Sequence, residues 1–268
     1  MVSKRMVVDS RPNKRLGQHW LTDNETLSNI VAAADISAAD TVLEVGPGLG
    51  TLTQALLATG ASLTAVEYDA ALATQLMKNI HEPNVQVIEH DILTFDFRSL
   101  PKDYKVVANI PYYLTSKLVR IVCESANPPK TTVLLVQKEV AQRIAAQPGA
   151  MSLLSISAQV YNTTTLGVVV PAALFTPPPK VDSQVIIMQR RPLPLVPHSL
   201  QKTFFRVVKA GFNERRKKLR SSLSGGLHLE KQQVDELLAS VSINASARAQ
   251  ELSIDDWVRL TKKYITTQ

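Results

Sequence analysis

The chain has 268 residues, 45% of them hydrophobic and 20% charged, and carries a formal net charge of +7. This composition fits a globular protein with one sizeable domain and a smaller one, and no apolar run is long enough to span a bilayer. The single cysteine, Cys123, excludes a disulfide framework and a cysteine-cluster metal site, so we expect no metal. The basic N-terminus lacks an apolar signal-peptide core, and we expect a cytoplasmic monomer with no membrane contact.

The part of the chain from residue 41 to residue 146 alternates between strand and helix patterns. Short apolar runs predict five strands, at residues 41–45, 62–67, 85–88, 105–108 and 132–136. Helical spacing predicts four helices between and after them, at residues 49–57, 70–79, 116–124 and 138–146. This alternation indicates an α/β fold with a mostly parallel sheet that helices cover on both faces.

The pattern changes after Gly149. Residues 151–161 are predicted to be helical, and two β-type runs at 168–170 and 185–188 flank the prolines at 177–179 and predict a hairpin-like edge of the sheet. The proline-rich stretch 191–197 cannot be the interior of a helix, so we interpret it as a linker. Four further helices are predicted at residues 200–210, 217–222, 230–239 and 254–264. The sequence therefore predicts a first domain over residues 1–196, with a basic N-terminal arm, and a helical domain over residues 197–268.

The positive charge is concentrated in two stretches. Residues 201–220 hold eight bases and one acid, and residues 1–20 hold five bases and one acid. Such asymmetry points to a polyanionic partner, although a solvated helix face and a basic tail give the same composition. Helical spacing allows several of these bases to share one face. The candidate nucleic-acid contacts are Lys202, Arg206, Lys209, Arg215, Arg216, Lys217, Lys218 and Arg220.

A glycine-rich turn, Glu44-Val-Gly46-Pro-Gly48-Leu-Gly50, follows the first predicted strand. Glycines let the backbone bend sharply and approach a ligand, and the next helix offers free N–H groups. The G-x-G-x-G form, with an acid two residues earlier, is similar to the turn of S-adenosylmethionine methyltransferases. A tight turn without a ligand is the alternative. We predict that Glu44, Gly46, Gly48 and Gly50 contact a cofactor.

Two further acids stand at the ends of the next strands. Glu67 ends the second predicted strand, where a carboxylate can accept both ribose hydroxyls of an adenosine. Asp91 follows the third strand, where a carboxylate can accept the amine of an adenine. Each acid taken alone is also explained as an exposed end of a strand. Polar groups at three successive strand ends favour one site for S-adenosyl-L-methionine.

The fourth predicted strand ends in Asn109-Ile110-Pro111-Tyr112. An aromatic amine is a weak nucleophile, and a site that activates it needs acceptors for its hydrogens. The side-chain oxygen of Asn109 and the carbonyl of Ile110 are suitable acceptors, Pro111 favours an extended Ile110, and Tyr112 offers a face on which an extruded base can stack. We predict these four residues as the catalytic group, with Asn109 also close to the cofactor; a plain β-turn is the alternative.

From about Lys14 to Tyr264 the chain resembles the ribosomal RNA adenine dimethyltransferases, a family that includes the bacterial KsgA (RsmA) enzymes and the erythromycin-resistance methyltransferases. The resemblance rests on the glycine turn, Glu67, Asp91, the Asn109–Tyr112 tetrapeptide and several further segments. These further segments are Leu16-Gly-Gln-His-Trp-Leu21, Leu135-Val-Gln-Lys-Glu-Val140, Phe175-Thr-Pro-Pro-Pro-Lys-Val-Asp-Ser183 and Gly211-Phe-Asn-Glu-Arg-Arg-Lys-Lys-Leu-Arg220. The family usually has Phe where Trp20 stands.

The resemblance implies a Rossmann-like class I methyltransferase fold with a small all-α C-terminal domain that helps to dock RNA. It also implies that His19 and Leu21 contact the cofactor, because the segment that contains them lies over the cofactor in such enzymes. The implied activity is N6 dimethylation of adjacent adenines in small-subunit ribosomal RNA, or in an immature small subunit, during ribosome biogenesis.

Two other functions remain open at this level. One is methylation of large-subunit RNA, as in the resistance enzymes, although Pro177–Ser183 and Arg215–Leu223 look more like the small-subunit enzymes. The other is a nucleic-acid-binding factor that has kept the fold without turnover. Glu67, Asp91 and the Asn109–Tyr112 tetrapeptide are intact, which favours activity.

Overall fold

The computed structural model describes residue 12 and residues 16–214 and 217–267. The chain divides into two compact units, Met1–Ala141 with Thr163–Arg190, and Gln142–Asn162 with Arg191–Gln268. The structure thus groups residues 142–162 with the C-terminal helices, whereas the sequence pattern suggests a single boundary at residue 196. That residues 1–196 and 197–268 are separate domains stays a prediction.

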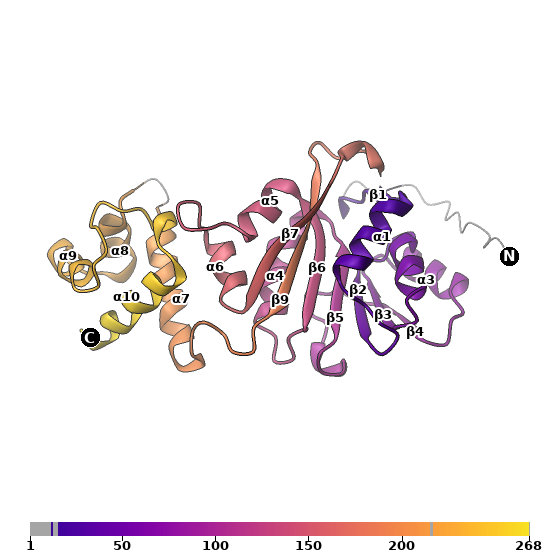
Figure 1. The fold of residues 1–268 in the computed structure, drawn as a ribbon, viewed down its shortest axis with the longest axis horizontal. Coiled ribbons are helices and arrows are strands. Elements are labelled where there is room, and N and C mark those ends of the chain that lie inside the picture. Colours follow the sequence, from indigo (N-terminus) through magenta and orange to yellow (C-terminus); the bar gives the residue numbers. More distant parts are fainter. Residues whose placement is uncertain (1–11, 13–15, 215–216, 268) are drawn as a thin grey trace. The chain divides into compact units, whose positions relative to one another are not determined.

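The first unit is built on a seven-stranded sheet with the order β4-β3-β2-β5-β6-β9-β7 (Figure 1). Its strands in chain order are β2 (Thr41–Val45), β3 (Ser62–Glu67), β4 (Val85–Glu89), β5 (Lys105–Asn109), β6 (Thr131–Gln137), β7 (Asn162–Val170) and β9 (Ser183–Arg190). The pairs from β4 through β6 are all parallel, and β9 runs antiparallel to β6. The mostly parallel α/β fold predicted from the sequence is confirmed.

The two late strands lie side by side, with β7 at the edge of the sheet and β9 between β7 and β6. The pattern predicted a strand only over residues 168–170, but β7 begins at Asn162. Its first half, Thr163–Thr165, is rich in a β-branched residue that favours strands. The threonines therefore account for the earlier start of the strand, which the prediction from the valines at 168–170 did not include.

Helices of the first unit follow the strands. Their bounds are α1 (Asn24–Ala33), α2 (Thr51–Leu57), α3 (Ala70–Asn79), α4 (Thr115–Cys123) and α5 (Lys138–Ile144), the last of which crosses into the second unit. Short 3₁₀ turns occur at η2 (Phe97–Ser99), η3 (Tyr112–Leu114), η4 (Ala172–Leu174) and, in the second unit, η5 (Ala249–Glu251). Leu27 and Ile30 of α1 and Leu52 and Leu56 of α2 share one core cluster with apolar residues of the sheet.

Helix α1 was not predicted, although its start carries a clear signal. The Asp23 side chain caps the helix by accepting the backbone N–H of Thr26 at 2.8 Å, as N-cap residues do. The buried residues Leu27 and Ile30 then follow at helical spacing.

A second, two-stranded sheet pairs β1 (Trp20–Leu21) with β8 (Phe175–Thr176) in antiparallel register. We call residues Leu16–Leu21 the strap. The hydroxyl of Thr51, the first residue of α2, donates to the carbonyl of Leu21 at 2.8 Å. These contacts hold the strap against the first unit near the turn that follows β2.

The second unit is helical. It contains α6 (Leu153–Gln159), α7 (His198–Phe212), α8 (Leu219–Leu227), α9 (Lys231–Ala239) and α10 (Ile254–Thr266). Its core gathers around the fully buried Trp257 and Phe204. Two glycines allow α7 to pack closely against its neighbours. A Cβ on Gly211 of α7 would lie 2.3 Å from Cη2 of Trp257 in α10, and a Cβ on Gly226 of α8 would lie 2.6 Å from Cβ of Ala210 in α7. None of the helices that the structure describes is both long and apolar enough to traverse a bilayer.

Replacing Gly211 by Ala should destabilise the helical unit. The new methyl group would overlap the Trp257 ring, and overpacking of this kind costs about 1–3 kcal/mol of unfolding free energy. Urea unfolding followed by Trp257 fluorescence measures the loss. The control is Gly225→Ala in α8, where a Cβ meets nothing within 4 Å; because Ala favours helix more than Gly, this variant should be as stable as the wild type or more stable. Equal stability of the Gly211→Ala and Gly225→Ala variants would contradict the packing argument.

Candidate functional site

A pocket of about 420 Å³ opens at the carboxyl ends of four parallel strands. Its walls come from the residues that end or follow β2, β3, β4 and β5, together with the strap and Phe175 of β8. The chain order reverses between β2 and β5, since β3 and β4 lie on one side and β6 on the other. Ligands of open α/β sheets bind at such a switch point. The topology and the pocket therefore identify the same place.

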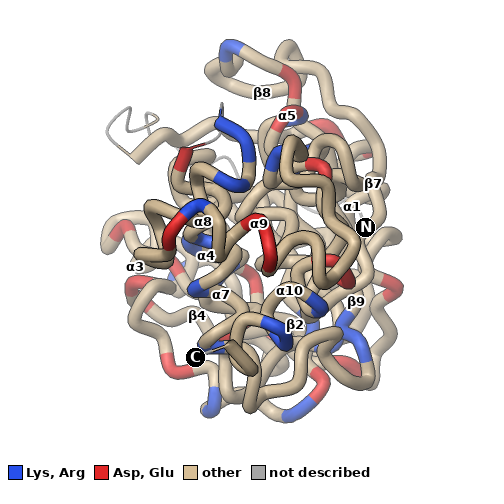
Figure 2. The backbone as a smooth tube through the Cα atoms, turned by 90° about the vertical axis from the view of Figure 1, so that its left-hand side faces the viewer, with Lys and Arg blue, Asp and Glu red and all other residues tan. Residues whose placement is uncertain are grey.

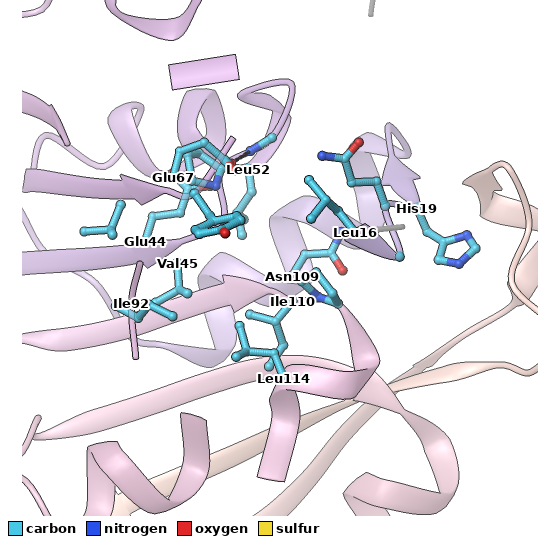
Figure 3. Close-up of a pocket in the computed structure, with 18 of the residues that line it drawn as sticks. Leu16, His19, Glu44, Val45, Leu52, Glu67, Ile92, Asn109, Ile110 and Leu114 are labelled. Carbon is cyan, nitrogen blue, oxygen red and sulfur yellow. Dashed lines mark hydrogen bonds between the residues drawn. The ribbon is translucent and has the colours of Figure 1, made fainter. Parts of the chain in front are cut away.

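Figure 3 shows how the lining side chains lie. Glu44 and Glu67 occupy one side of the pocket, Asn109 and Ile110 lie on another, and His19 belongs to the strap. The candidates from the sequence that line the pocket are His19, Leu21, Glu44, Gly46, Gly48, Glu67, Asp91, Asn109, Ile110, Pro111 and Tyr112. Among the cofactor and catalytic candidates, Gly50 alone does not line the pocket. It is the N-cap of α2, and its N–H donates to the Pro47 carbonyl at 2.9 Å.

The glycine turn needs a backbone that other residues rarely adopt. Gly46, Gly48 and Gly50 have φ angles of +66°, +56° and +80°, in the left-handed region that glycine enters without a steric penalty. A Cβ on Gly48 would also lie 2.7 Å from Cζ3 of Trp20. The turn thus has both the conformation and the bare backbone that a close ligand requires.

Glu67 is buried and holds the turn in place. One carboxylate oxygen accepts the N–H of Gly48 at 3.0 Å, and the other accepts the N–H of Asp69 at 2.9 Å. Burial raises the pKa of Glu67, and these backbone donors oppose the rise. The carboxylate therefore links the ends of β2 and β3, and Glu67 also lines the pocket.

Glu44 is the second buried acid, with 1% of its surface exposed. Neither of its carboxyl oxygens has a well-formed hydrogen bond to any of the described residues. Burial raises the pKa of Glu44 to about 8, the nearby Thr53 hydroxyl opposes the rise, and the charge of Glu67 adds to it. A buried carboxyl without a partner is costly, and a cation in the pocket would lower that cost.

Asp91 completes the acidic lining. Its Oδ1 accepts the N–H of Leu93 at 2.9 Å, which fixes the turn after β4. Ile92 is buried in the same turn. Two exposed tyrosines, Tyr68 and Tyr113, line the pocket. Partial burial raises the pKa of Tyr113, and the nearby charges of Asp91 and Glu67 raise it further. The pocket therefore combines carboxylates with flat apolar surfaces.

The Asn109–Tyr112 tetrapeptide begins at the last residue of β5. Asn109 is half-buried, Ile110 is buried, and Pro111 has an extended backbone with φ −55° and ψ 134°. The hydroxyl of Tyr112 shares a hydrogen bond of 2.8 Å with the hydroxyl of Ser183. The ring of His19 stacks on Tyr112 with 6.0 Å between centroids. Contacts from two distant segments thus set the orientation of the Tyr112 ring.

Several lining residues were missed by the sequence reasoning. Trp20, Tyr68, Tyr113 and Phe175 all line the pocket. Tyr68 and Tyr113 directly follow the predicted site residues Glu67 and Tyr112, so their positions in the sequence could have indicated that they line the pocket. The only sequence indication for Trp20 was its position between the predicted cofactor contacts His19 and Leu21. Its indole N–H is buried without an acceptor among the described residues.

The basic candidates lie elsewhere. Lys202, Arg206 and Lys209 are exposed on α7, Lys217 and Lys218 are exposed just before α8, and Arg220 is half-buried in α8. Arg215 and Arg216 lie outside the described residues. None of the described basic candidates lines the pocket. The part of the chain that the structure describes contains no cluster of His, Cys, Asp or Glu that could hold a metal ion.

Residues 9–266 match the family model of the ribosomal RNA adenine dimethylases. The chain belongs to this family. A relative from Dehalococcoides mccartyi named ribosomal RNA small subunit methyltransferase A is 40% identical over 258 residues, which cover 95% of this chain and 89% of the relative. A Synechocystis relative with the same name is 41% identical, and the match covers 94% of this chain and 95% of the relative. The family resemblance and the enzyme class expected from the sequence are confirmed.

Two solved structures share the fold. The 23S ribosomal RNA methyltransferase ErmE is 27% identical, with a TM-score of 0.73 over 91% of this chain and 98% of that one. A dimethyladenosine transferase from Plasmodium falciparum is 24% identical, with a TM-score of 0.79 over 92% and 98%. The methyltransferase family implies S-adenosylmethionine as the methyl donor, and the pocket fits it. The unpartnered Glu44 carboxyl and the two further acids suit a ligand that carries positive charge.

The free energy of unfolding of the Glu44→Gln variant should depend less on pH than that of the wild type. In the unfolded chain Glu44 ionises near pH 4.5, whereas in the folded protein it keeps its proton up to about pH 8. Between these values the unfolded state binds fewer protons, so the wild type loses stability as pH rises, by at most about 1.4 kcal/mol per pH unit. Urea unfolding of both proteins at pH 5, 6.5 and 8 measures the difference. Parallel pH curves would show that Glu44 does not titrate in this way.

Trp20 should report ligand binding by its fluorescence. The chain has two tryptophans, and Trp257 is fully buried in the core of the helical unit. Binding of S-adenosylmethionine beside the Trp20 ring should change the emission of the wild type and of Trp257→Phe, but not that of Trp20→Phe. Because Trp20→Phe also removes ring atoms that pack on Gly48, the melting temperature of each variant is measured alongside its emission. A full signal in Trp20→Phe would place the ligand away from the strap.

Proposed function

We propose that this chain transfers methyl groups from S-adenosyl-L-methionine to the N6 amines of adjacent adenines in small-subunit ribosomal RNA. The observation that carries the proposal is the pocket that brings the Asn109–Tyr112 tetrapeptide next to the glycine turn and its acids. When bound, S-adenosylmethionine supplies a methyl group that its sulfonium has already activated.

The acids and the turn would hold the cofactor. Glu67 would accept the ribose hydroxyls while it keeps the bonds to Gly48 and Asp69, and Asp91 would accept the adenine amine. Gly46 and Gly48 let the backbone approach the ligand, whereas Gly50 acts through the start of α2. His19 and Leu21 would cover the pocket from the strap. Glu44, which keeps its proton up to about pH 8 without the ligand, would release it when the cofactor binds and so balance positive charge.

The tetrapeptide would position the target amine. The Asn109 side-chain oxygen and the Ile110 carbonyl would accept its two hydrogens, so that the nitrogen lone pair turns toward the methyl group. Pro111 keeps the preceding backbone extended, and the Tyr112 ring would stack on the extruded base. A new N–C bond forms, the S–C bond breaks, and the amine then loses a proton. Since Asn109 is uncharged, positioning and electrostatics would carry the rate.

The small-subunit substrate is favoured by the names of the relatives described above. Relatives about 40% identical over nearly the whole chain are named small-subunit methyltransferases, whereas the resistance-type structure is 27% identical. The helical unit, with its exposed lysines on α7, would dock the RNA. The RNA would be presented as part of an immature small subunit, and the protein would act as a monomer.

Replacing Asn109 by Ala should lower the rate of methyl transfer by about 10²–10³-fold, because one acceptor that fixes the amine is lost. The assay follows labelled methyl transfer from S-adenosylmethionine to unmethylated small-subunit particles. Asn79→Ala is the matched control, because Asn79 is exposed at the end of α3 and does not line the pocket. A full rate in Asn109→Ala would rule out the assigned role of Asn109.

Primer extension on both ribosomal RNAs identifies the substrate, since dimethyladenine blocks the pairing edge and stops the polymerase. Stops in small-subunit RNA alone support the proposal. Stops in large-subunit RNA instead would assign the protein to the resistance type, and stops in neither RNA would mean a binding role without turnover.

A further inference from the structure

Contacts to phosphate do not distinguish RNA from DNA. Figure 2 marks the Lys and Arg positions of α7, α8 and α10 in blue, and bases of this kind attract a polyanion without reading its sugar. Recognition of ribose needs a group that tells a 2′-hydroxyl from a hydrogen atom. Such a group must lie beside the nucleotide that the pocket receives.

Two contacts hold the ring of His19 at one side of the pocket. Its Nδ1–H donates to the Pro177 carbonyl at 2.7 Å, and the ring stacks on Tyr112 with 6.0 Å between centroids and 23° between planes. A separation of this size belongs to an offset stack, and both His19 and Tyr112 are half-buried. The offset leaves part of the Tyr112 face uncovered, with the edge of the imidazole beside it.

The bond to Pro177 decides what the other ring nitrogen of His19 can do. A carbonyl only accepts, so the proton is on Nδ1, and in the neutral ring Nε2 carries a lone pair and no hydrogen. This lone pair lies in the plane of the ring and points outward from its edge. Nε2 therefore accepts a hydrogen bond and cannot donate one.

Under the proposed function, the pose of the target base brings its ribose to the His19 side of the pocket. The amine is held at Asn109 and Ile110, and the base lies on the Tyr112 ring. The amine and the glycosidic bond are on opposite sides of an adenine, so the ribose points away from Asn109. Figure 3 shows Asn109 between Glu67 and His19, and the ring of His19 points away from the acids.

Within an RNA chain the 2′-hydroxyl is the one hydrogen-bond donor of the ribose, because phosphodiester bonds esterify the 3′ and 5′ oxygens. Phosphate oxygens only accept, so they do not match a lone pair. We propose that Nε2 of His19 accepts a hydrogen bond from the 2′-hydroxyl of the target nucleotide, which makes His19 a specificity-determining residue for RNA. The inference rests on the proposed function, because it uses the pose of an adenine in this pocket. This role differs from the cofactor contact that the family resemblance implies for His19.

The test replaces the 2′-hydroxyl by hydrogen at the adjacent adenines that primer extension identifies. Ligated small-subunit RNA with 2′-deoxyadenosine at these positions is assembled into unmethylated particles. The Kd is measured with S-adenosylhomocysteine, which has no methyl group to transfer. The wild type should bind these particles about 3–10-fold more weakly than all-ribose particles, because one hydrogen bond is lost. Deoxy substitution of two other nucleotides of the same RNA is the control and should leave the Kd unchanged.

Two variants of His19 separate the roles of its ring nitrogens. His19→Asn keeps a donor near the place of Nδ1 but has no acceptor at the place of Nε2, so it should bind both kinds of particle with the same Kd. His19→Gln puts an amide oxygen near the place of Nε2 and should keep the preference for ribose. His81→Asn is the matched control, because His81 is exposed and does not line the pocket. The melting temperature and the affinity for S-adenosylmethionine are measured for each protein.

Three results would overturn the inference. The first is an equal Kd of the wild type for both kinds of particle. The second is a ribose preference that His19→Asn retains in full; weaker binding of S-adenosylmethionine by this variant would then assign the ring to the cofactor. The third is a lower slope of log Kd against log salt concentration in His19→Asn, which would assign the ring to a phosphate. Methylation without a ribose preference refutes this inference alone, whereas absence of methylation in both ribosomal RNAs refutes the proposed function and this inference with it.

Discussion

The buried hydrogen bond from the Gly48 N–H to the Glu67 carboxylate is the constraint on which the pocket depends. The same carboxylate accepts the N–H of Asp69, which caps α3. One side chain therefore fixes the turn after β2 and the start of the helix after β3. The strap depends on the same turn, because the Trp20 ring occupies the space that a Cβ on residue 48 would need.

The charges of the two units suit different ligands. The pocket is lined by Glu44, Glu67 and Asp91, while the exposed bases of α7 and α10 lie in the helical unit. Under the proposed function, the acids around the pocket would favour a cationic cofactor and repel phosphates, so that an uncharged base is the part of an RNA that would enter. Under the proposed function, the backbone of that RNA would need a separate basic surface, which the exposed bases of the second unit would supply.

Most of the fold and of the pocket could be predicted from the sequence because they are encoded locally. Apolar runs predict the parallel strands, and the polar residues that follow them predict the acids and the tetrapeptide of the pocket. These residues lie together because the carboxyl ends of parallel strands meet at one edge of the sheet. Non-local contacts could not be predicted in this way. Nothing near Trp20 indicates that it pairs with Thr176 and covers Gly48, and nothing near Arg206 indicates that Tyr264 holds it. Helix α6 likewise joins the C-terminal helices through core contacts that its own pattern does not reveal.

The proline-rich segment between η4 and β9 acquires a role from these long-range contacts. The Pro177 carbonyl accepts a hydrogen bond of 2.7 Å from Nδ1 of His19, and Ser183 binds the hydroxyl of Tyr112. Since a carbonyl can only accept, His19 must carry its proton on Nδ1. The segment and the first residue of β9 thus hold the two stacked rings, and β9 pairs with β6. A stiff, proline-rich connection suits the proposed function, in which a base would stack on Tyr112 and would need a ring whose orientation is set before it arrives.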